Sequence, residues 1–277
     1  MYTKQKSAYL RGSSLWDVPI EEVVIPHKHA AGEDGKEIPL YVRTPPGGQQ
    51  DQKWPTILLI TGLDGHRPDN TERLDDFLAR GWACVVCDIP GVADCPADKR
   101  DAKSPDRLFS SIFEWIEEQR SLDSKRVIGW GLSAGGYYAI RAAHTHADKL
   151  LGAVGHGAGT HHYIGKEWLQ EVDHHEYPFE LRTAYLGKYG YKDWEELLEN
   201  CQKDFSLVEN GILDKKSCRL LLVNGVLDGC MPVEDSMLLA EYGRPKEMRF
   251  VQGRAHMGYP EANSFVWPWL EEVMGSR

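Results

Sequence analysis

The chain has 277 residues and a formal net charge of −10 at pH 7, and 42% of its residues are hydrophobic and 27% charged. These values are typical of a globular protein with a sizeable core, and the length suits one α/β sheet that carries an insertion. The acidic balance argues against nucleic acid and anionic membranes as partners, because both attract basic surfaces.

The N-terminal segment and the cysteines indicate a cytoplasmic protein. Residues 1–16 are polar and lack the apolar stretch of a secretory signal, and no run of the chain has the length of a membrane span. Cys84 and Cys87 fall inside an apolar segment, where a free cysteine behaves as a small hydrophobic residue. We therefore expect the six cysteines to be reduced structural thiols.

The first predicted elements are three strands. Residues 21–26 and 37–43 are joined by the polar turn 30–36, which predicts an antiparallel hairpin at the edge of a sheet. After a Pro- and Gly-rich break, residues 56–61 form an apolar run that is typical of a strand buried on both faces.

Helix and strand patterns then alternate as far as residue 154. Such alternation implies right-handed crossovers and a parallel sheet with helices on both faces. The predicted elements are a helix at 71–80, a strand at 83–87, a helix at 104–119, a strand at 126–130, a helix at 137–146 and a strand at 151–154.

The alternation lapses in residues 155–217, which carry helical patterns and many histidine and aromatic residues but no convincing strand. Strands at 219–224 and 248–252 and a helix at 265–274 follow. We predict an α/β fold with a mostly parallel twisted sheet. Residues 1–154 and 218–277 would form its core, and 155–217 a helical cap inserted between two core strands.

The most informative motif is Gly131-Leu132-Ser133-Ala134-Gly135, at the junction of a predicted strand and helix. Glycines on both sides of a serine let the two backbones approach closely and leave the hydroxyl unshielded. The motif alone is equally compatible with a plain strand–turn–helix in which Ser133 is a cap. As a nucleophile elbow, it predicts the α/β-hydrolase fold and requires an acid and a histidine later in the chain.

Candidates for both partners come after strands, in the required order. Asp228 follows the predicted strand 219–224, whereas Glu234 and Asp235 are better explained as the acidic first turn of the next helix. His256 lies in the loop between the last strand and the last helix. We predict a catalytic triad of Ser133, Asp228 and His256, in which His256 takes the proton from the serine.

An oxyanion hole requires two backbone N–H groups. One should come from Ala134, directly after the nucleophile. The other should come from the loop after strand 56–61, where Leu63 is the best-placed donor and Asp64 the next.

The wider sequence resembles one group of hydrolases. The segments that carry the resemblance are 60–65, 88–91, 104–107, 130–138, 143–146, 161–162, 176–178, 222–225 and 256–258. They are similar to the polyketide-shortening α/β-hydrolases of fungal naphthol-pigment (melanin) synthesis, known for the yellowish-green pigment type. The resemblance places the family's triad on Ser133, Asp228 and His256.

The resemblance implies a cofactor-free retro-Claisen cleavage of a carbon–carbon bond, which removes a short acyl side chain from an aromatic polyketide. Members of that group carry a further helical region before the hydrolase core, whereas this chain starts almost at the core. We therefore expect the pocket, and with it the size of the substrate, to differ from theirs.

Polar residues near the expected site could bind substrate or could have a structural role. Asp64, His161, His162 and Tyr163 are candidates for substrate binding, and the last three are equally well explained by capping and packing. His144 and His146, on the helix after Ser133, favour a structural role.

Other polar groups favour structure over chemistry. Asp88 and Asp94 favour a role in a turn. The histidine pairs 161/162 and 174/175 lack an acid or cysteine at ligand spacing, so we expect no metal.

Two other functions stay open. A carboxylesterase or lactonase could use the same triad, and a non-catalytic receptor on a hydrolase fold would require its loss or sequestration. We expect a small aromatic polyketide-like substrate as the partner, with no nucleic acid, membrane or cofactor, and a homodimer as an open alternative.

Overall fold

The computed structural model describes residues 2–48, 51–177 and 180–275, and within these ranges it contains one sheet of eight strands. The strand order is β1-β2-β4-β3-β5-β6-β7-β8, in which β2 pairs antiparallel with β1 and β4 while the other neighbours are parallel. The strands are β1 (Glu21–Pro26), β2 (Glu37–Arg43), β3 (Trp54–Ile60), β4 (Ala83–Cys87), β5 (Leu122–Leu132), β6 (Gly152–His156), β7 (Arg219–Gly225) and β8 (Glu247–Val251).

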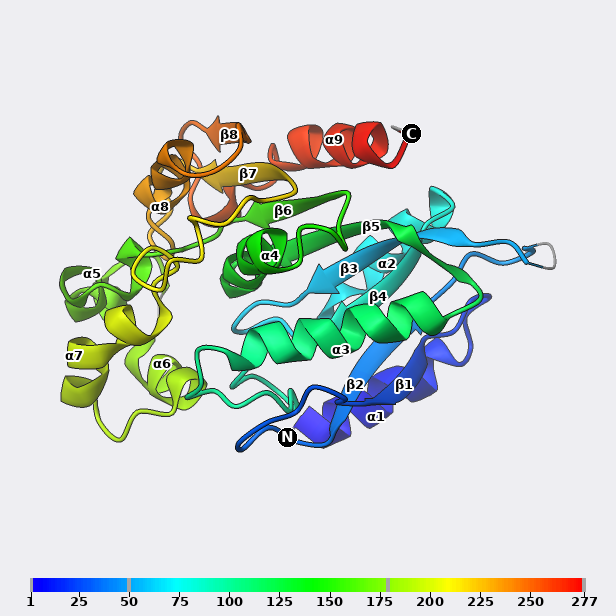
Figure 1. Cartoon of the computed structure of the whole chain (residues 1–277), viewed down its shortest axis with the longest axis horizontal. Coiled ribbons are helices and arrows are strands. Elements are labelled where there is room, and N and C mark those ends of the chain that lie inside the picture. Colours follow the sequence, from blue (N-terminus) through cyan, green and yellow to red (C-terminus); the bar gives the residue numbers. More distant parts are fainter. Residues whose placement is uncertain (1, 49–50, 178–179, 276–277) are drawn as a thin grey trace.

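Helices connect the strands and cover both faces of the sheet (Figure 1). The α-helices are α1 (Tyr2–Ser13), α2 (Thr71–Ala79), α3 (Ser104–Glu118), α4 (Ala134–Thr145), α5 (Lys166–Gln170), α6 (Arg182–Tyr189), α7 (Trp194–Phe205), α8 (Val233–Leu238) and α9 (Asn263–Gly275). Short 3₁₀ helices are η1 (Arg67–Asn70), η2 (His162–Ile164), η3 (Val172–His174), η4 (Leu239–Glu241) and η5 (His256–Gly258).

Apolar side chains on the two faces of the sheet build two separate cores. In β3, Leu58 and Ile60 belong to the core under α3 and α4, while Ile57 and Leu59 belong to the core under α2 and α9. All four side chains are fully buried, because successive residues of a strand point to opposite faces. This explains why the strand has an apolar run rather than an alternating pattern.

The helices between β6 and β7 lie beyond the carboxyl ends of the parallel strands (Figure 1). The described residues from 157 to 217 contain helices and no strand. Tyr189 of α6 and Phe205 of α7 are buried in the same core as α4, and the Tyr137 hydroxyl of α4 donates to the Phe205 carbonyl at 2.8 Å. These helices therefore pack firmly on the sheet domain, and their role as a cap over a substrate stays a prediction.

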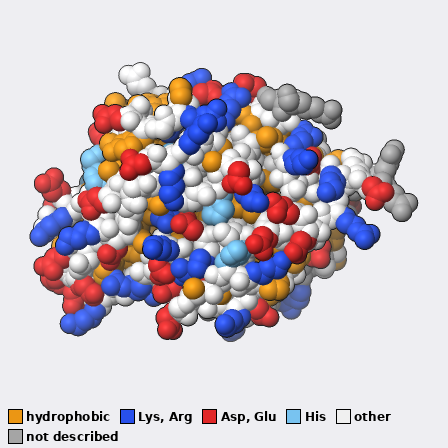
Figure 2. All heavy atoms as spheres, in the orientation of Figure 1, with side chains coloured by type: hydrophobic (Ala, Val, Ile, Leu, Met, Phe, Trp, Pro, Cys, Tyr) orange, Lys and Arg blue, Asp and Glu red, His pale blue; other side chains and the backbone are white. Residues whose placement is uncertain are grey.

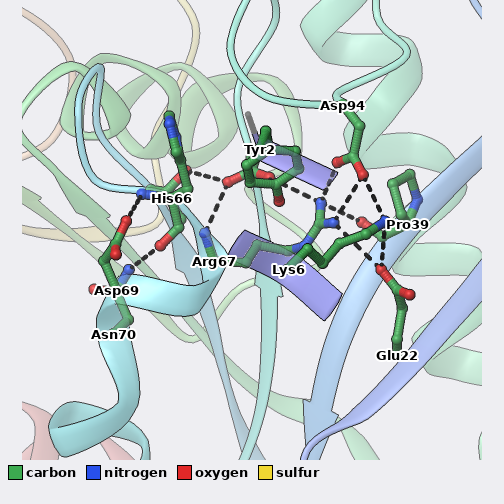
Figure 3. Close-up of polar contacts among 11 residues, drawn as sticks. Tyr2, Lys6, Glu22, Pro39, His66, Arg67, Asp69, Asn70 and Asp94 are labelled. Carbon is green, nitrogen blue, oxygen red and sulfur yellow. Dashed lines mark hydrogen bonds and ion pairs between the residues drawn. The ribbon is translucent and has the colours of Figure 1, made fainter. Parts of the chain in front are cut away.

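Helix α1 is not predicted by the sequence pattern, because its residues are polar and only Ser13 is buried. Tertiary contacts hold it instead. The Lys6 ammonium pairs with Glu22 at 2.8 Å and with Asp94 at 3.0 Å, and the Tyr2 hydroxyl donates to Asp88 at 3.1 Å (Figure 3). The helix is thus fixed to the first strand and to the loop after β4.

The surface and the cysteines show how charge and thiols are distributed. Acidic and basic side chains are interspersed over the face that Figure 2 shows. The six cysteines are free, and only Cys95 is partly exposed, as expected for structural thiols. In the part of the chain that the structure describes, no helix combines the length and the apolar character that crossing a bilayer requires.

Candidate active site

Ser133 lies at the sharp turn between β5 and α4. Its φ of 54° and ψ of −124° are unfavourable for a side-chain-bearing residue, and such a conformation costs about 1–3 kcal/mol. A Cβ atom at Gly131 would lie 2.1 Å from the Gly135 oxygen, and one at Gly135 would lie 2.3 Å from the Thr61 oxygen. The backbones therefore approach too closely for side chains at both glycines, which explains the spacing of the motif.

The structure brings Ser133, His256 and Asp228 into one hydrogen-bonded chain. His256 Nε2 lies 2.8 Å from Ser133 Oγ, and His256 Nδ1 lies 2.8 Å from Asp228 Oδ2. The other oxygen of Asp228 accepts the N–H groups of Cys230 at 2.7 Å and Met231 at 2.8 Å. The buried carboxylate is thereby fixed, and with Nδ1 donating to it, Nε2 is left to accept the serine proton.

Glu176, in the segment between η3 and α6, ties together the loops that carry Asp228 and His256. Its two carboxylate oxygens lie 3.0 and 2.8 Å from the backbone nitrogen of His256, which donates to them. The second oxygen also accepts the N–H of Gly229 at 3.1 Å. A side chain from the predicted cap therefore contacts the loops that carry Asp228 and His256.

His156, at the end of β6, supports the same histidine loop from within the core. Burial lowers its pKa to about 3, so the ring is neutral and its Nε2–H donates to the Met257 carbonyl at 2.8 Å. Its own carbonyl accepts the N–H of Ser133 at 2.8 Å. One buried residue thus connects the turn at Ser133 to the loop that follows His256.

The predicted oxyanion donors border a common narrow cavity of about 10 Å³. Ala134 is the first residue of α4, so its N–H has no acceptor within the helix. Leu63 follows β3 in a loop whose two ends are held by Asp88 Oδ1, which accepts the Thr61 hydroxyl at 2.9 Å and the Arg67 N–H at 3.1 Å. Asp88 therefore anchors this loop, whereas the sequence pattern favoured a role in a turn.

Arg67 completes this anchor in the network that Figure 3 shows. Its guanidinium is fully buried and pairs with Asp88 at 2.8 Å and with Asp94 at 2.9 Å, and it also donates to the Pro39 carbonyl at 3.0 Å. Asp94 is thus part of a buried ion-pair network that also includes Lys6 of α1. The end of the loop that carries Leu63 is thereby held to β2 and to the residues that follow β4.

The four predicted substrate-binding residues lie in different surroundings. Tyr163 is buried, its hydroxyl lies 2.9 Å from that of Tyr189, and its side chain borders the cavity next to Leu63 and Ala134. Asp64 is exposed and accepts the Tyr177 hydroxyl at 3.1 Å.

His161 and His162 point elsewhere. The Nδ1 atom of His161 lies 2.7 Å from Ser206 Oγ, and His162 borders a separate surface groove that contains none of the triad residues. Of the four candidates, Tyr163 alone lines the small cavity.

Asp235 explains how this segment is held. It lies in the first turn of α8, as predicted, and its buried carboxylate accepts the N–H groups of His161 at 2.7 Å, His162 at 2.8 Å and Tyr163 at 2.9 Å. The carboxylate therefore caps the 3₁₀ helix η2, which lies more than seventy residues earlier in the chain. Nothing in the local sequence signals this contact.

Known proteins match this chain over nearly its whole length. The model of the family described as "Esterase FrsA-like" matches residues 22–275, which include the three residues of the hydrogen-bonded chain. The protein belongs to the FrsA-like esterase family.

The curated relatives that match this chain are bacterial. The esterase FrsA of Photorhabdus laumondii subsp. laumondii is 26% identical over 194 residues, which cover 67% of this chain and 44% of that protein. The quorum-quenching protein AidA of Acinetobacter baumannii is 31% identical over 104 residues, covering 36% of this chain and 34% of that protein. The chain thus spans less than half the length of these relatives, and they do not confirm the fungal group that the sequence resembles.

Solved structures share the fold. The 2,6-dihydroxy-pseudo-oxynicotine hydrolase superposes with a TM-score of 0.77 at 18% identity, covering 98% of this chain and 71% of that one. The α/β-hydrolase GrgF from Penicillium sp. sh18 gives a TM-score of 0.66 at 16% identity, covering 92% of this chain and 98% of that one. These likenesses confirm the predicted α/β-hydrolase fold of the FrsA-like chain.

One buried cation of this FrsA-like chain was not predicted from the sequence. Lys188, near the end of α6, is 4% exposed and borders the cavity next to Leu63 and Ala134. Its Nζ donates to the Pro90 carbonyl at 2.6 Å and to the Tyr138 hydroxyl at 2.7 Å. Nothing in the sequence around Lys188 indicates that this side chain is buried. Its position beside the cavity is therefore seen only in the structure.

One group of potential metal ligands lies at the site, but its chemistry does not favour metal binding. Ligand-type atoms of Asp228, Cys230 and His256 lie within 4.8 Å of one another. However, Asp228 and His256 are hydrogen bonded to each other, and burial raises the pKa of Cys230, which disfavours the thiolate that a metal requires. Within the described ranges, no such group of three includes His161, His162, His174 or His175.

Proposed function

We propose that this FrsA-like protein is a serine hydrolase that transfers an acyl group to water through Ser133. The observation that carries the proposal is the strained serine turn joined by two 2.8 Å contacts to His256 and Asp228. A serine hydroxyl is a weak nucleophile at neutral pH unless an adjacent base takes its proton. This arrangement supplies that base and fixes its tautomer.

The proposed first half-reaction forms an acyl-serine. Ser133 Oγ attacks the carbonyl carbon while His256 Nε2 takes the hydroxyl proton, and Asp228 stabilises the resulting imidazolium. The negative oxygen of the tetrahedral intermediate would accept the N–H groups of Leu63 and Ala134. When the intermediate collapses, His256 gives its proton to the leaving group. Water then repeats the sequence and releases the acid.

We further propose that the leaving group can be a carbon atom. In a retro-Claisen cleavage, the bond between the carbonyl carbon and the ring-bearing carbon breaks, and His256 protonates the stabilised carbanion or enolate. The segments that resemble the polyketide-shortening hydrolases support this reaction. A plain carboxylesterase or lactonase is the second candidate.

A substrate panel separates these possibilities. Wild-type protein and Ser133→Ala are incubated with 4-nitrophenyl esters, acyl-naphthols and naphthopyrones, and the products are identified by mass spectrometry. Release of a short acid from the carbon-linked substrates by wild type alone supports the retro-Claisen assignment. Turnover of the esters alone contradicts it and favours the esterase. Wild type that hydrolyses none of them contradicts the hydrolase proposal and favours a receptor.

A further inference from the structure

We propose that Lys188 binds an anionic oxygen of the substrate, so that the enzyme selects acyl groups carrying a carboxylate or the enolate of a β-dicarbonyl. This inference rests on the proposed hydrolase function and names its substrate class. Lys188 contacts none of Ser133, His256 and Asp228 through a described hydrogen bond, so it is separate from the triad.

The cavity connects Lys188 to the position where an acyl group would lie. Its wall contains Leu63 and Ala134, whose N–H groups are the proposed donors to the carbonyl oxygen, and it also contains Lys188. A carbonyl held by those donors would direct its acyl chain toward this space, which measures about 10 Å³, so the side chains around it must move apart to admit the chain. The remaining wall consists of Tyr163, Tyr185, Tyr189 and Met231, which supply no carboxylate.

The surroundings of Lys188 are arranged for a cation that lacks a counter-ion. Two of its three N–H groups are used by the Pro90 carbonyl and the Tyr138 hydroxyl, which leaves one donor. Its Nζ also lies 4.8 Å from the ring centre of Tyr138 and 5.1 Å from that of Tyr189, within cation–π range. Among the described residues, no carboxylate lies within 4.0 Å of the ammonium.

Neighbouring backbone holds the amine in this place. Gly91 has a φ of 78°, and a Cβ atom there would lie 2.0 Å from the Lys188 carbonyl oxygen. The loop after β4 therefore packs directly on the end of α6, which brings the Pro90 carbonyl to Nζ. A buried charge without an ionic partner is unfavourable. A bound anion would supply that partner.

The electrostatics give the site a pH dependence. Burial lowers the pKa of Lys188 to about 7, so the free pocket loses its charge as the pH rises through neutrality. Burial also raises the pKa values of the titratable groups around it, which stay neutral in this range. These groups are Cys95, Tyr138, Tyr163, Tyr185, Tyr189 and Cys201. Affinity for an anionic substrate should therefore be highest below pH 7 and fall above it.

The test compares substrates of matched shape. One pair is mono-4-nitrophenyl succinate and 4-nitrophenyl 4-methylpentanoate, in which an isopropyl group replaces the carboxylate. The other is 1-phenylbutane-1,3-dione and its 2,2-dimethyl derivative, which has no hydrogen between its carbonyls and cannot form the stabilised β-dicarbonyl enolate. Initial rates are measured between pH 6 and 8.5, with uncatalysed hydrolysis subtracted. The first pair reports on a carboxylate and the second on an enolate.

We expect wild type to prefer the anionic member of at least one pair by roughly 10- to 100-fold in kcat/KM, as one charge-assisted hydrogen bond allows. The KM of the succinate ester, whose carboxylate is ionised throughout this range, should rise with pH through about 7, whereas the KM of its isopropyl partner should not. Lys188→Met should abolish the preference through KM. The matched control is Lys99→Met, because the exposed Lys99 donates to the Gly187 carbonyl of the same helix from outside the cavity.

Three results would overturn the inference and leave the hydrolase intact. Wild type could hydrolyse both members of each pair equally well. Lys188→Met could lower kcat/KM equally for anionic and neutral members, which would show a purely structural role. Should the variant fail to fold, a KM of the wild-type enzyme for the succinate ester that is independent of pH would serve the same purpose. Failure of the hydrolase proposal itself has a different signature: no substrate is turned over and Ser133 does not react with a fluorophosphonate.

Discussion

Replacing Glu176 by alanine should slow catalysis although the residue touches neither substrate nor a side chain of the triad. In the structure, its carboxylate accepts the backbone N–H of His256 at 2.8 Å and that of Gly229 at 3.1 Å. Hydrogen bonds to a charged group contribute about 1.5–3 kcal/mol, and the lower end applies because Glu176 is exposed. Losing the hydrogen bonds to the loop that carries His256 should lower kcat about 10- to 30-fold. This corresponds to a rise of about 1.4–2 kcal/mol in the activation free energy.

The assay is the steady-state hydrolysis of a 4-nitrophenyl ester, with rates divided by the fraction of protein that a fluorophosphonate labels. Glu176→Gln should recover most of the rate, because its amide oxygen can still accept one N–H group. The matched control is Glu171→Ala, which removes an exposed carboxylate just before η3. If Glu176→Ala keeps the wild-type kcat per labelled site, Glu176 does not position His256, and the argument from these contacts is refuted.

Three further predictions follow from buried contacts. Asp228→Asn should lower kcat by about 10⁴-fold, because the amide no longer fixes the His256 tautomer, and a pre-steady-state ester assay would measure this. Arg67→Met should lower the free energy of unfolding in urea by about 3–5 kcal/mol, because it leaves the Asp88 carboxylate buried without its cation. Gly131→Ala should give little folded protein by circular dichroism, since its Cβ atom would lie 2.1 Å from a backbone oxygen of α4.

The sheet could be predicted from the sequence because burial on both faces leaves a direct record in the residues. The apolar run of β3 predicted a central strand, and the structure places it between β4 and β5. The hairpin of β1 and β2 was also predicted, with the observed bounds. Helix α1 could not be predicted, since its stability comes from ion pairs such as Lys6 with Glu22 rather than from an apolar stripe.

Some residues of the candidate site could also be predicted from the sequence, and others could not. Ser133, Asp228 and His256 could be selected because each follows a predicted strand, and strand ends converge in this fold. The structure then brings these three side chains into contact. Glu176 and Lys188 could not be selected, because their partners lie on loops far away in the chain, and no local pattern records such contacts.

The measurement that tests the central claim most directly is the mass of the protein after reaction with a fluorophosphonate, followed by mapping of the modified peptide. One adduct, located on Ser133, should form with wild type and not with Ser133→Ala. Labelling should also slow strongly in His256→Ala, because the serine then keeps its proton. An unmodified Ser133 in folded wild-type protein, or an adduct on another residue, would contradict the proposed nucleophile.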